Sequence, residues 1–416
     1  MSTYVYQADS QRLQTGLGAI GLPVSATPTP DFTCSISCYL YRNPDGSIRW
    51  IWPVGADQPD FLRFYQVGSQ RAQVFIWLVR LLFRLKLGRL VAQDRLILYT
   101  TVDGYQLFRR SQLNRWALFM GTPSPNRKLV LWYSTRSSKS YFLKIALTSP
   151  ATNTLRQEAL ALRQVQRVPF LELETPRLKS YSGAVLIQED MGLADGRQTT
   201  QLADFPSGAL QELVSRNWHT QLLQQTDFWL QARETVSELW ITNDPRIPVS
   251  LLIKLEQLMR SINEQSPVPL AAAHGDFTPR NALLMGDRLC VVDWALYQAG
   301  LPGLYDLFHF LYQSTTLIEH KGYGVIRQQI DATLNQPEWQ LFRERHPIDT
   351  NLSEMLYLVH TITHHLSAYS RQEEWHQQTD WQLTTWNDAL TYWLNRTQAV
   401  SAQKLLLHDL AFWSEA

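Results

Sequence analysis

A short polar segment, "HGDFTPRN", contains side chains that can carry out acid–base and metal chemistry. It holds His274, Asp276 and Asn281, and Asp293 follows at the end of the apolar run "LCVV". Carboxylates beside apolar strands are unfavourable unless a positive charge lies opposite them. Asp276 can accept or orient a hydroxyl proton, and the oxygens of Asn281 and Asp293 suit Mg²⁺, which would supply that charge. The pattern therefore predicts metal-assisted phosphoryl transfer to a hydroxyl group.

These residues resemble the catalytic and metal-binding segments of the aminoglycoside phosphotransferase/choline kinase-like family, whose fold is the protein-kinase fold. The resemblance lies in "HGDFTPRN", in "VVDW" twelve positions further on, and in the following "LYDLFHFL". It implies that Asp276 is the catalytic base and that Asn281 and Asp293 bind Mg²⁺. It also implies that His274 props the catalytic loop and that Asp306 steadies it.

Upstream segments supply the other parts that such a site needs, a strand lysine for the nucleotide phosphates and a glutamate from the next helix. Lys144 lies in the strand-like "SYFLKIAL", and Glu158 lies in the helical "LRQEALAL". The segment "AVLIQEDMG" resembles the interlobe hinge, where Gln188, Glu189 and Asp190 would meet the adenine. The resemblance covers roughly residues 115–315, and it implies ATP and Mg²⁺ as cofactors.

The chain departs from the family pattern at Thr278, Arg280 and Ala295. Arg280 adds a cation that can either stabilise charge near the phosphates or pair with a surface carboxylate. The loop expected to cover the phosphates, "GTPSPNRK", contains a single glycine, Gly121.

Two functions from different classes fit these features. The first is an ATP- and Mg-dependent phosphotransferase acting on a hydroxyl of a small molecule, such as a sugar or an amino alcohol. The second is a catalytically inactive kinase-fold protein that binds nucleotide or acts as a scaffold. The intact charged set favours the enzyme, and a protein-hydroxyl kinase is a third, weaker alternative. The carboxylates after residue 315 are scattered, so the sequence does not name the acceptor.

The elements that must position these residues form an α+β pattern. Three runs, "RWALFM", "KLVLWYS" and "SYFLKIAL", predict antiparallel strands, and a helix with Thr152 or Asn153 as its N-cap follows them. Strands are expected at "RLKSYS" and "GAVLIQED", and mostly helices after Leu210. We therefore predict an N-terminal extension over 1–112, an antiparallel N-lobe over 113–192 and a helical C-lobe over 193–416.

The segment 1–112 contains a predicted hairpin around the turn "NPDG" and an apolar helix over 75–91. Four basic residues interrupt this helix, which argues against a membrane span: Arg80, Arg84, Lys86 and Arg89. They do not gather on one side of a helical wheel over that range, so docking within the chain is favoured. Contact with a membrane surface stays open as the alternative.

Composition narrows the remaining classes. A net charge of +1 gives no basic excess for nucleic-acid binding. Three cysteines and the absence of a signal-peptide pattern at the N-terminus favour a reducing, cytoplasmic location. In "HTITHH", which contains His360, His364 and His365, two histidines have the i and i+4 spacing of metal ligands on a helix. No third ligand to such a pair is evident, so zinc is disfavoured. The oligomeric state is not indicated.

Overall fold

The chain divides into two compact units. The computed structural model describes residues 2–65, 70–109, 115–121, 124, 126–192, 196–372, 374–375 and 378–414. The sheet unit comprises Met1–Phe170, Glu174–Gln198 and Arg280–Leu296, and the helical unit comprises Leu171–Leu173, Thr199–Pro279 and Tyr297–Ala416. The predicted α+β class, an antiparallel sheet followed by a mainly helical part, is confirmed.

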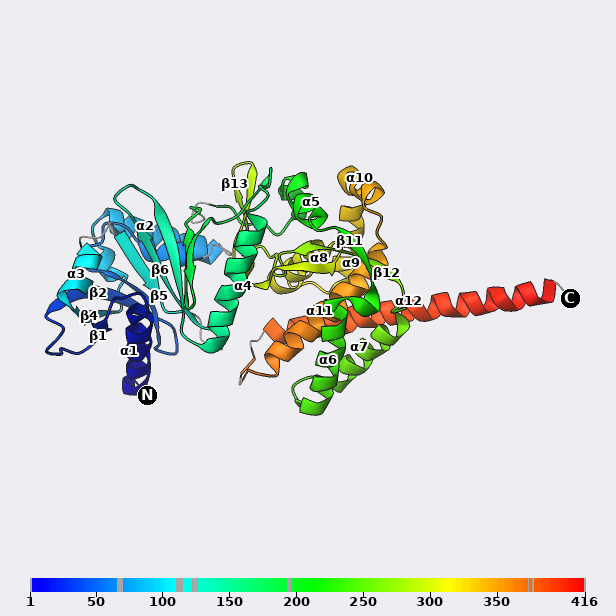
Figure 1. Ribbon diagram of the computed structural model, residues 1–416, viewed down its shortest axis with the longest axis horizontal. Coiled ribbons are helices and arrows are strands. Elements are labelled where there is room, and N and C mark those ends of the chain that lie inside the picture. Colours follow the sequence, from blue (N-terminus) through cyan, green and yellow to red (C-terminus); the bar gives the residue numbers. More distant parts are fainter. Residues whose placement is uncertain are drawn as a thin grey trace. The chain divides into compact units, whose positions relative to one another are not determined.

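A nine-stranded sheet dominates the sheet unit (Figure 1). Its strands lie in the order β1 (Val24–Ser25), β4 (Asp94–Thr100), β2 (Cys34–Arg42), β3 (Ile48–Pro53), β5 (Arg115–Phe119), β6 (Lys128–Ser134), β7 (Ser140–Ala146), β10 (Val185–Glu189) and β9 (Leu178–Ser182). Neighbouring strands pair antiparallel. The predicted strands within 115–189 and the hairpin around "NPDG" are all present.

The sheet continues without a break from the N-terminal segment into the strands that carry Lys144. Strand β3 pairs with β5 through Trp50 opposite Phe119 and Ile51 opposite Leu118. Residues 24–100 thus contribute β1–β4 to the same sheet as β5–β7. The N-terminal segment therefore docks within the chain, the alternative that the spread of basic residues over its helix favours.

Helices pack on both faces of this sheet. Leu118 of β5 shares a core cluster with Leu17 of α1 (Ser2–Gly18). Its neighbour Ala117 points the other way and shares a second cluster with Phe83 of α2 (Gln70–Arg84). Because successive side chains of a strand face opposite sides, α1 and α2 cover opposite faces. A third helix, α4 (Ser149–Val165), packs against Leu186 of β10.

Helix α2 is shorter than predicted. It ends at Arg84, where the sequence pattern favours a helix to residue 91. Lys86 adopts a left-handed conformation with φ of 58°, and the Leu87 amide donates to the Leu82 carbonyl at 2.8 Å, the six-to-one bond of a helix C-cap. The next residues form the short η2 (Gly88–Leu90). Over the described part of the chain, no helix is both long enough and apolar enough to cross a bilayer.

Shorter elements complete the sheet unit. These are η1 (Asp60–Phe64), α3 (Val102–Arg109), β13 (Ala282–Met285), β14 (Arg288–Val291) and η6 (Trp294–Leu296), with β8 (Leu173–Glu174) at the boundary between the units. Strands β13 and β14 pair as an antiparallel hairpin, with Ala282 opposite Val291.

The helical unit combines a small sheet with many helices. Its sheet has the order β11 (His219–Leu222), β12 (Pro267–Ala273), β15 (Gln298–Pro302). Its helices are α5 (Ser207–Ser215), α6 (Asp227–Thr242), α7 (Val249–Ser261), α8 (Tyr305–Gln313), α9 (Tyr323–Leu334), α10 (Pro337–Arg345), α11 (Thr350–Tyr369) and α12 (Gln378–Ser414), with shorter turns η4 (Leu202–Asp204), η5 (Leu223–Gln225) and η7 (Ser314–Ile318).

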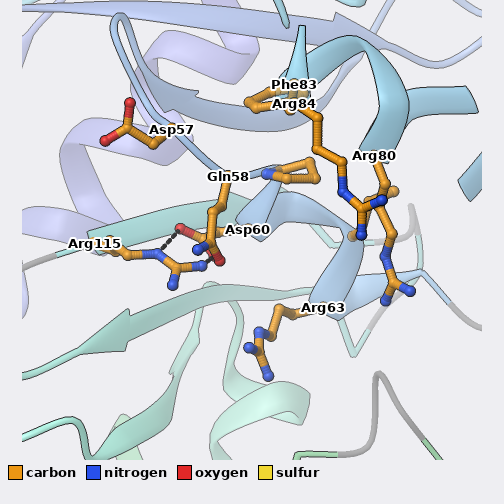
Figure 2. Close-up of a pocket in the computed structure, with 10 residues that line it drawn as sticks. Asp57, Gln58, Asp60, Arg63, Arg80, Phe83, Arg84 and Arg115 are labelled. Atoms are coloured by element: carbon orange, nitrogen blue, oxygen red, sulfur yellow. Dashed lines mark hydrogen bonds and ion pairs between the residues drawn. The ribbon is translucent and has the colours of Figure 1, made fainter. Parts of the chain in front are cut away.

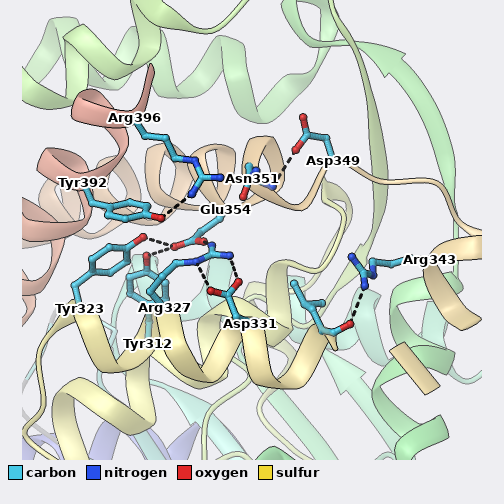
Figure 3. A network of polar contacts seen from close by, with 11 residues as sticks. Tyr312, Tyr323, Arg327, Asp331, Arg343, Asp349, Asn351, Glu354, Tyr392 and Arg396 are labelled. Carbon is cyan, nitrogen blue, oxygen red and sulfur yellow. Dashed lines mark hydrogen bonds and ion pairs between the residues drawn. The ribbon is translucent and has the colours of Figure 1, made fainter. Parts of the chain in front are cut away.

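A buried carboxylate fastens three of these helices together (Figure 3). Glu354 of α11 accepts hydrogen bonds from Tyr312 of α8 at 2.8 Å and Tyr323 of α9 at 3.0 Å, and it pairs with Arg327. Burial raises the pKa of Glu354, and Arg327 and the two hydroxyls oppose that rise. A buried carboxylate with its partners in place is tolerated, and the network fixes how the helices meet.

Candidate active site

A buried ion pair forms the centre of the site in the sheet unit. Leu143 and Ile145 enter the core on the α1 face of the sheet, so strand alternation directs Lys144 to the opposite face. Helix α4 packs on that face and buries Glu158 completely. The Lys144 Nζ atom lies 2.5 Å from Glu158 Oε1 and 3.8 Å from Asp293 Oδ1.

These contacts decide the charge of Lys144. Burial lowers the pKa of the amine, but the Glu158 and Asp293 carboxylates together more than offset this effect and leave the pKa above its ordinary value. Lys144 is therefore a cation at neutral pH, placed between a fully buried carboxylate and the half-exposed side chain of Asp293.

The start of α4 differs from the sequence prediction. The N-cap is Thr148, whose Oγ1 accepts from the Ala151 amide at 3.2 Å, and the helix begins at Ser149. Thr152 and Asn153 lie inside it, so the predicted N-cap was wrong. Proline lacks an amide hydrogen, and amides in the first turn of a helix have no acceptor within the helix, so proline is favoured there. Pro150 therefore marks the start of α4 in the sequence.

A second lysine on the same sheet face escaped sequence reasoning. Lys128 of β6 lies opposite Ala146, and Val130 lies opposite Lys144, so Lys128 and Lys144 are diagonal neighbours on one face. Burial and the nearby Lys144 charge lower the pKa of Lys128. The alternation of β6, combined with its predicted pairing to β7, could have identified this residue.

The β13–β14 hairpin brings Asn281 and Asp293 together. The two residues flank the hairpin, and the Val292 amide donates to the Asn281 carbonyl at 2.9 Å. Asp293 adopts a left-handed backbone conformation with φ of 65°. That conformation is costly for a residue other than glycine, and its presence at a polar site suggests a functional constraint.

The donor chemistry of these two side chains suits a magnesium ion. An amide oxygen and a carboxylate are hard donors, and Mg²⁺ typically takes one or two carboxylates and completes its shell with water and phosphate oxygens. In the part of the chain that the structure describes, no group of three or more His, Cys, Asp or Glu side chains is arranged to hold a metal. A phosphate-bound Mg²⁺ does not require such a group.

The catalytic-loop segment is organised by a buried carboxylate in the helical unit. Asp306, in the first turn of α8, accepts from the His274 amide at 2.6 Å and from the Gly275 amide at 3.1 Å. Burial raises the pKa of Asp306, while the nearby His274 opposes the rise. Two consecutive backbone amides are thus held by one fully buried side chain.

Asp276 follows this clamp, and a histidine contacts it. The Asp276 amide donates to His274 Nδ1 at 3.3 Å, and the partly exposed Asp276 carboxylate has its Oδ1 3.4 Å from His309 Nε2. The other ring nitrogen of His309 lies 3.4 Å from the Tyr357 hydroxyl. Sequence reasoning missed His309, although it follows Asp306 by three positions, a spacing that places both on one side of α8.

The structure thus brings the sequence-predicted residues into two groups, each within one unit. Lys144, Glu158, Asn281 and Asp293 gather in the sheet unit, and His274, Asp276 and Asp306 gather in the helical unit.

A comparison with protein-family models identifies the chain. The model of the phosphotransferase enzyme family matches residues 125–344, more than half of the sequence. The chain belongs to this family. The match confirms the family predicted from the motifs around Asp276 and Asp293. A search of curated protein sequences finds no significant match.

Several solved structures are similar to this phosphotransferase family member at low sequence identity. The structure of a gentamicin–APH(2")-IIa complex is 13% identical over 70% of this chain and 95% of that chain, with a TM-score of 0.42. Choline kinase LicA from Streptococcus pneumoniae is 12% identical over 71% and 98%, with a TM-score of 0.43. Amicoumacin kinase hAmiN in complex with AMP-PNP, Ca²⁺ and Ami is 12% identical over 67% and 87%, with a TM-score of 0.40.

The expected hinge of this family member has its amides partly engaged. The Glu189 amide donates to the Arg177 carbonyl and the Asp190 amide to the Ser140 carbonyl, both at 2.9 Å. Gln188 is buried in β10. The amide hydrogens of Glu189 and Asp190 are therefore engaged within the protein.

The Asp190 side chain has a structural task of its own. Its Oδ2 accepts from Trp132 Nε1 at 2.7 Å and Ser140 Oγ at 3.1 Å, and it pairs with Arg63 at 3.2 Å. Arg63 belongs to η1, so this carboxylate ties the N-terminal segment to the end of β10.

The histidines of α11 are uncharged at neutral pH. Burial lowers the pKa of His360 to about 3, and it also lowers the pKa values of His364 and His365. The His360 Nδ1 atom lies 3.0 Å from the Tyr305 hydroxyl. This contact and the stacked ring of His364 give His360 a packing role.

Proposed function

We propose that this protein transfers the γ-phosphate of ATP, in the presence of Mg²⁺, to a hydroxyl group of a small molecule. The observation that carries the proposal is the buried Lys144–Glu158 pair with Asp293 3.8 Å from the same amine. A cation held between two carboxylates is prepared to exchange one of them for phosphate oxygens without losing its charge balance. A protein that only served as a scaffold would gain little from burying these charges.

The polar residues that cluster in the sheet unit each take a part in nucleotide binding. Lys144 contacts the phosphates and is oriented by Glu158. Lys128, on the same face of the sheet, adds a second cation for them. Asn281 and Asp293 hold Mg²⁺, which neutralises charge on the phosphate oxygens when it is bound.

The helical unit supplies the base. As the substrate oxygen forms its bond to the γ-phosphorus, the bond between that phosphorus and the bridging oxygen of ADP breaks, and the hydroxyl proton passes to the Asp276 carboxylate. His309 positions this carboxylate through its Nε2 atom, and Tyr357 positions His309. Asp306 keeps the loop backbone in place.

The acceptor class is a small hydroxylated molecule such as a sugar or an amino alcohol. The experiment that tests the proposal is a screen of such molecules by ADP release, with and without Mg²⁺. Acceptor-dependent ADP formation is expected. Asp276→Asn should reduce turnover by about 10²–10⁴-fold, the usual loss for a general base, while nucleotide binding stays close to that of the wild type.

The same experiment distinguishes the alternative of an inactive kinase-fold protein. Tight binding of Mg·ATP with no ADP formed for any acceptor would favour that alternative. His309→Gln provides a second check, because a positioning role predicts a lower kcat with little change in the KM for ATP. Wild-type turnover in Asp276→Asn would show that Asp276 is not the base.

A further inference from the structure

One side of helix α2 is apolar and exposed. Ile76, Val79 and Phe83 face the sheet and are buried. On the other side, Val74 and Trp77 each keep 64% of their surface exposed, and Leu78 keeps 46%. Leu85, Leu87 and Leu90 in the following turn are also exposed. An apolar strip of this kind on a folded protein commonly marks an interaction surface.

The segment that carries this strip has charges of a single sign. From residue 61 to residue 93 the chain contains no acidic residue and six basic ones. The basic residues are Arg63, Arg71, Arg80, Arg84, Lys86 and Arg89. We call the exposed strip Val74, Trp77, Leu78, Leu85, Leu87 and Leu90, together with Arg71, Arg80, Arg84, Lys86 and Arg89, the α2 surface.

A cavity of about 480 Å³ lies beside α2, and arginines line it from three elements (Figure 2). Arg80 and Arg84 come from α2, Arg63 from η1 and Arg115 from β5. Figure 2 shows Arg80 and Arg84 on one side, Arg115 paired with Asp60 on the other, and Arg63 below and between them.

Two aspartates, Asp57 and Asp60, also line the cavity. Asp60 is buried and engaged by Arg115, and Arg63 pairs with Asp190. The exposed Asp57 lies away from the two α2 arginines in Figure 2. The side of the cavity next to α2 is therefore cationic.

The helical spacing joins the cavity to the apolar strip. Trp77, Arg80 and Arg84 follow one another at i, i+3 and i+7, so they lie along one line of the helix. This line runs between the buried side, marked by Phe83, and the exposed strip, marked by Leu78. A helix that continued to residue 91 would place Lys86 and Arg89 at other points around its circumference. Because α2 ends at Arg84, these two residues lie beyond the helix, and Arg80 and Arg84 stay on one line.

We infer that the α2 surface docks onto an anionic phospholipid bilayer. The apolar strip enters the interfacial layer, where tryptophan is favoured. The flanking arginines contact lipid phosphates, and the cavity between α2 and η1 receives a phosphate headgroup at Arg80 and Arg84. Charge complementarity selects this occupant, because an apolar strip flanked along its own segment by basic residues matches a surface that is both apolar and anionic.

Vesicle flotation of the full chain tests the inference. We expect binding to vesicles of phosphatidylcholine mixed with phosphatidylglycerol, little binding to phosphatidylcholine alone, and release at high salt. Arg80→Gln/Arg84→Gln should lower the partition coefficient by about tenfold or more, and Trp77→Ser should lower it as well. Neither variant alters a residue assigned to phosphoryl transfer, so ADP formation without vesicles should be unchanged.

Matched variants separate vesicle binding by the α2 surface from nonspecific electrostatic or hydrophobic binding. Arg156→Gln/Arg163→Gln removes the same charge from exposed positions of α4, and Ile241→Ser removes an exposed apolar side chain from α6; both should bind vesicles like the wild type. Equal losses in these controls, or no preference for anionic vesicles, would overturn the inference. So would light scattering that shows an oligomer dispersed by Trp77→Ser, because the surface would then be an interface between copies of the chain.

Discussion

Replacing Lys144 by methionine separates the structural and chemical roles of the buried pair. In Lys144→Met, the Glu158 carboxylate stays fully buried without its cation. Breaking a buried pair from one side costs about 3–5 kcal/mol, because a charge is left uncompensated. Asp293 contributes little to this loss, since its side chain is 48% exposed and its Oδ1 lies 3.8 Å from the Lys144 Nζ atom.

The double variant Lys144→Met/Glu158→Leu removes both charges and should regain most of that stability. Replacing a buried pair by apolar residues of similar volume is often neutral. For a unit of this size, a loss of 3–5 kcal/mol corresponds to roughly 6–20 °C in melting temperature. Phosphoryl transfer should be lost in both variants, because both lack the cation for the phosphates.

Thermal or denaturant unfolding of the wild type, both single variants and the double variant measures the coupling between the two residues. The cycle should give a coupling of about 2 kcal/mol or more, toward the upper end for contacting residues. A single variant as stable as the wild type, or a double variant no more stable than Lys144→Met, would refute the description of a buried and mutually dependent pair. Activity that returned with stability in the double variant would refute the phosphate role of Lys144.

Three further predictions concern metal, phosphate and pH. Asp293→Ala should weaken Mg·ATP binding more than metal-free ATP binding in calorimetry, and equal losses would make Asp293 structural. Lys128→Met should raise the KM for ATP by about tenfold, the loss of one charge-assisted contact, with little change in kcat; an unchanged KM would exclude phosphate contact. Because His360 has a pKa of about 3 in the folded protein and 6.5 ordinarily, the unfolded chain binds the proton first. The contribution of His360 to the free energy of unfolding is therefore complete above pH 6.5 and falls as the pH drops toward 3, with a loss of about 2 kcal/mol at pH 5. Denaturant titrations above pH 6.5 and at pH 5 should show that His360→Gln lacks this part of the loss.

The strands around Lys144 were predictable because their signal is local. Alternating side chains and turn residues lie next to one another in the sequence, and the structure places β5, β6 and β7 where they predict them. Lys144 and Glu158 are 14 positions apart, so a strand followed by a helix suffices to pair them. The Lys128 position follows from the same alternation.

Other features depend on contacts that the sequence pattern does not contain. The pairing of Trp50 with Phe119 joins segments far apart in the chain, and apolar strands alone do not choose their partners. The end of α2 depends on the left-handed Lys86, a conformation for which the residue type gives no warning. In the sequence His309 is one side chain of an apolar helix, and only the fold shows that it contacts Asp276.

The order of strands in the nine-stranded sheet also has a consequence for how the protein is made. From β3 onward, each strand or hairpin joins the edge left open by the one before it: β5, β6, β7 and then the β9–β10 hairpin. Strands β1 to β4 are synthesised first and can form a template before Lys144 leaves the ribosome, since chains fold from the N-terminal side during synthesis. Two of these additions close long loops, the step from β3 to β5 and the step from β7 across α4 to the β9–β10 hairpin, so the barrier to assembly concentrates at these two steps. Strands β1 to β4 are therefore expected to pair before β5, β6 and β7 join them, once residue 100 has emerged from the ribosome.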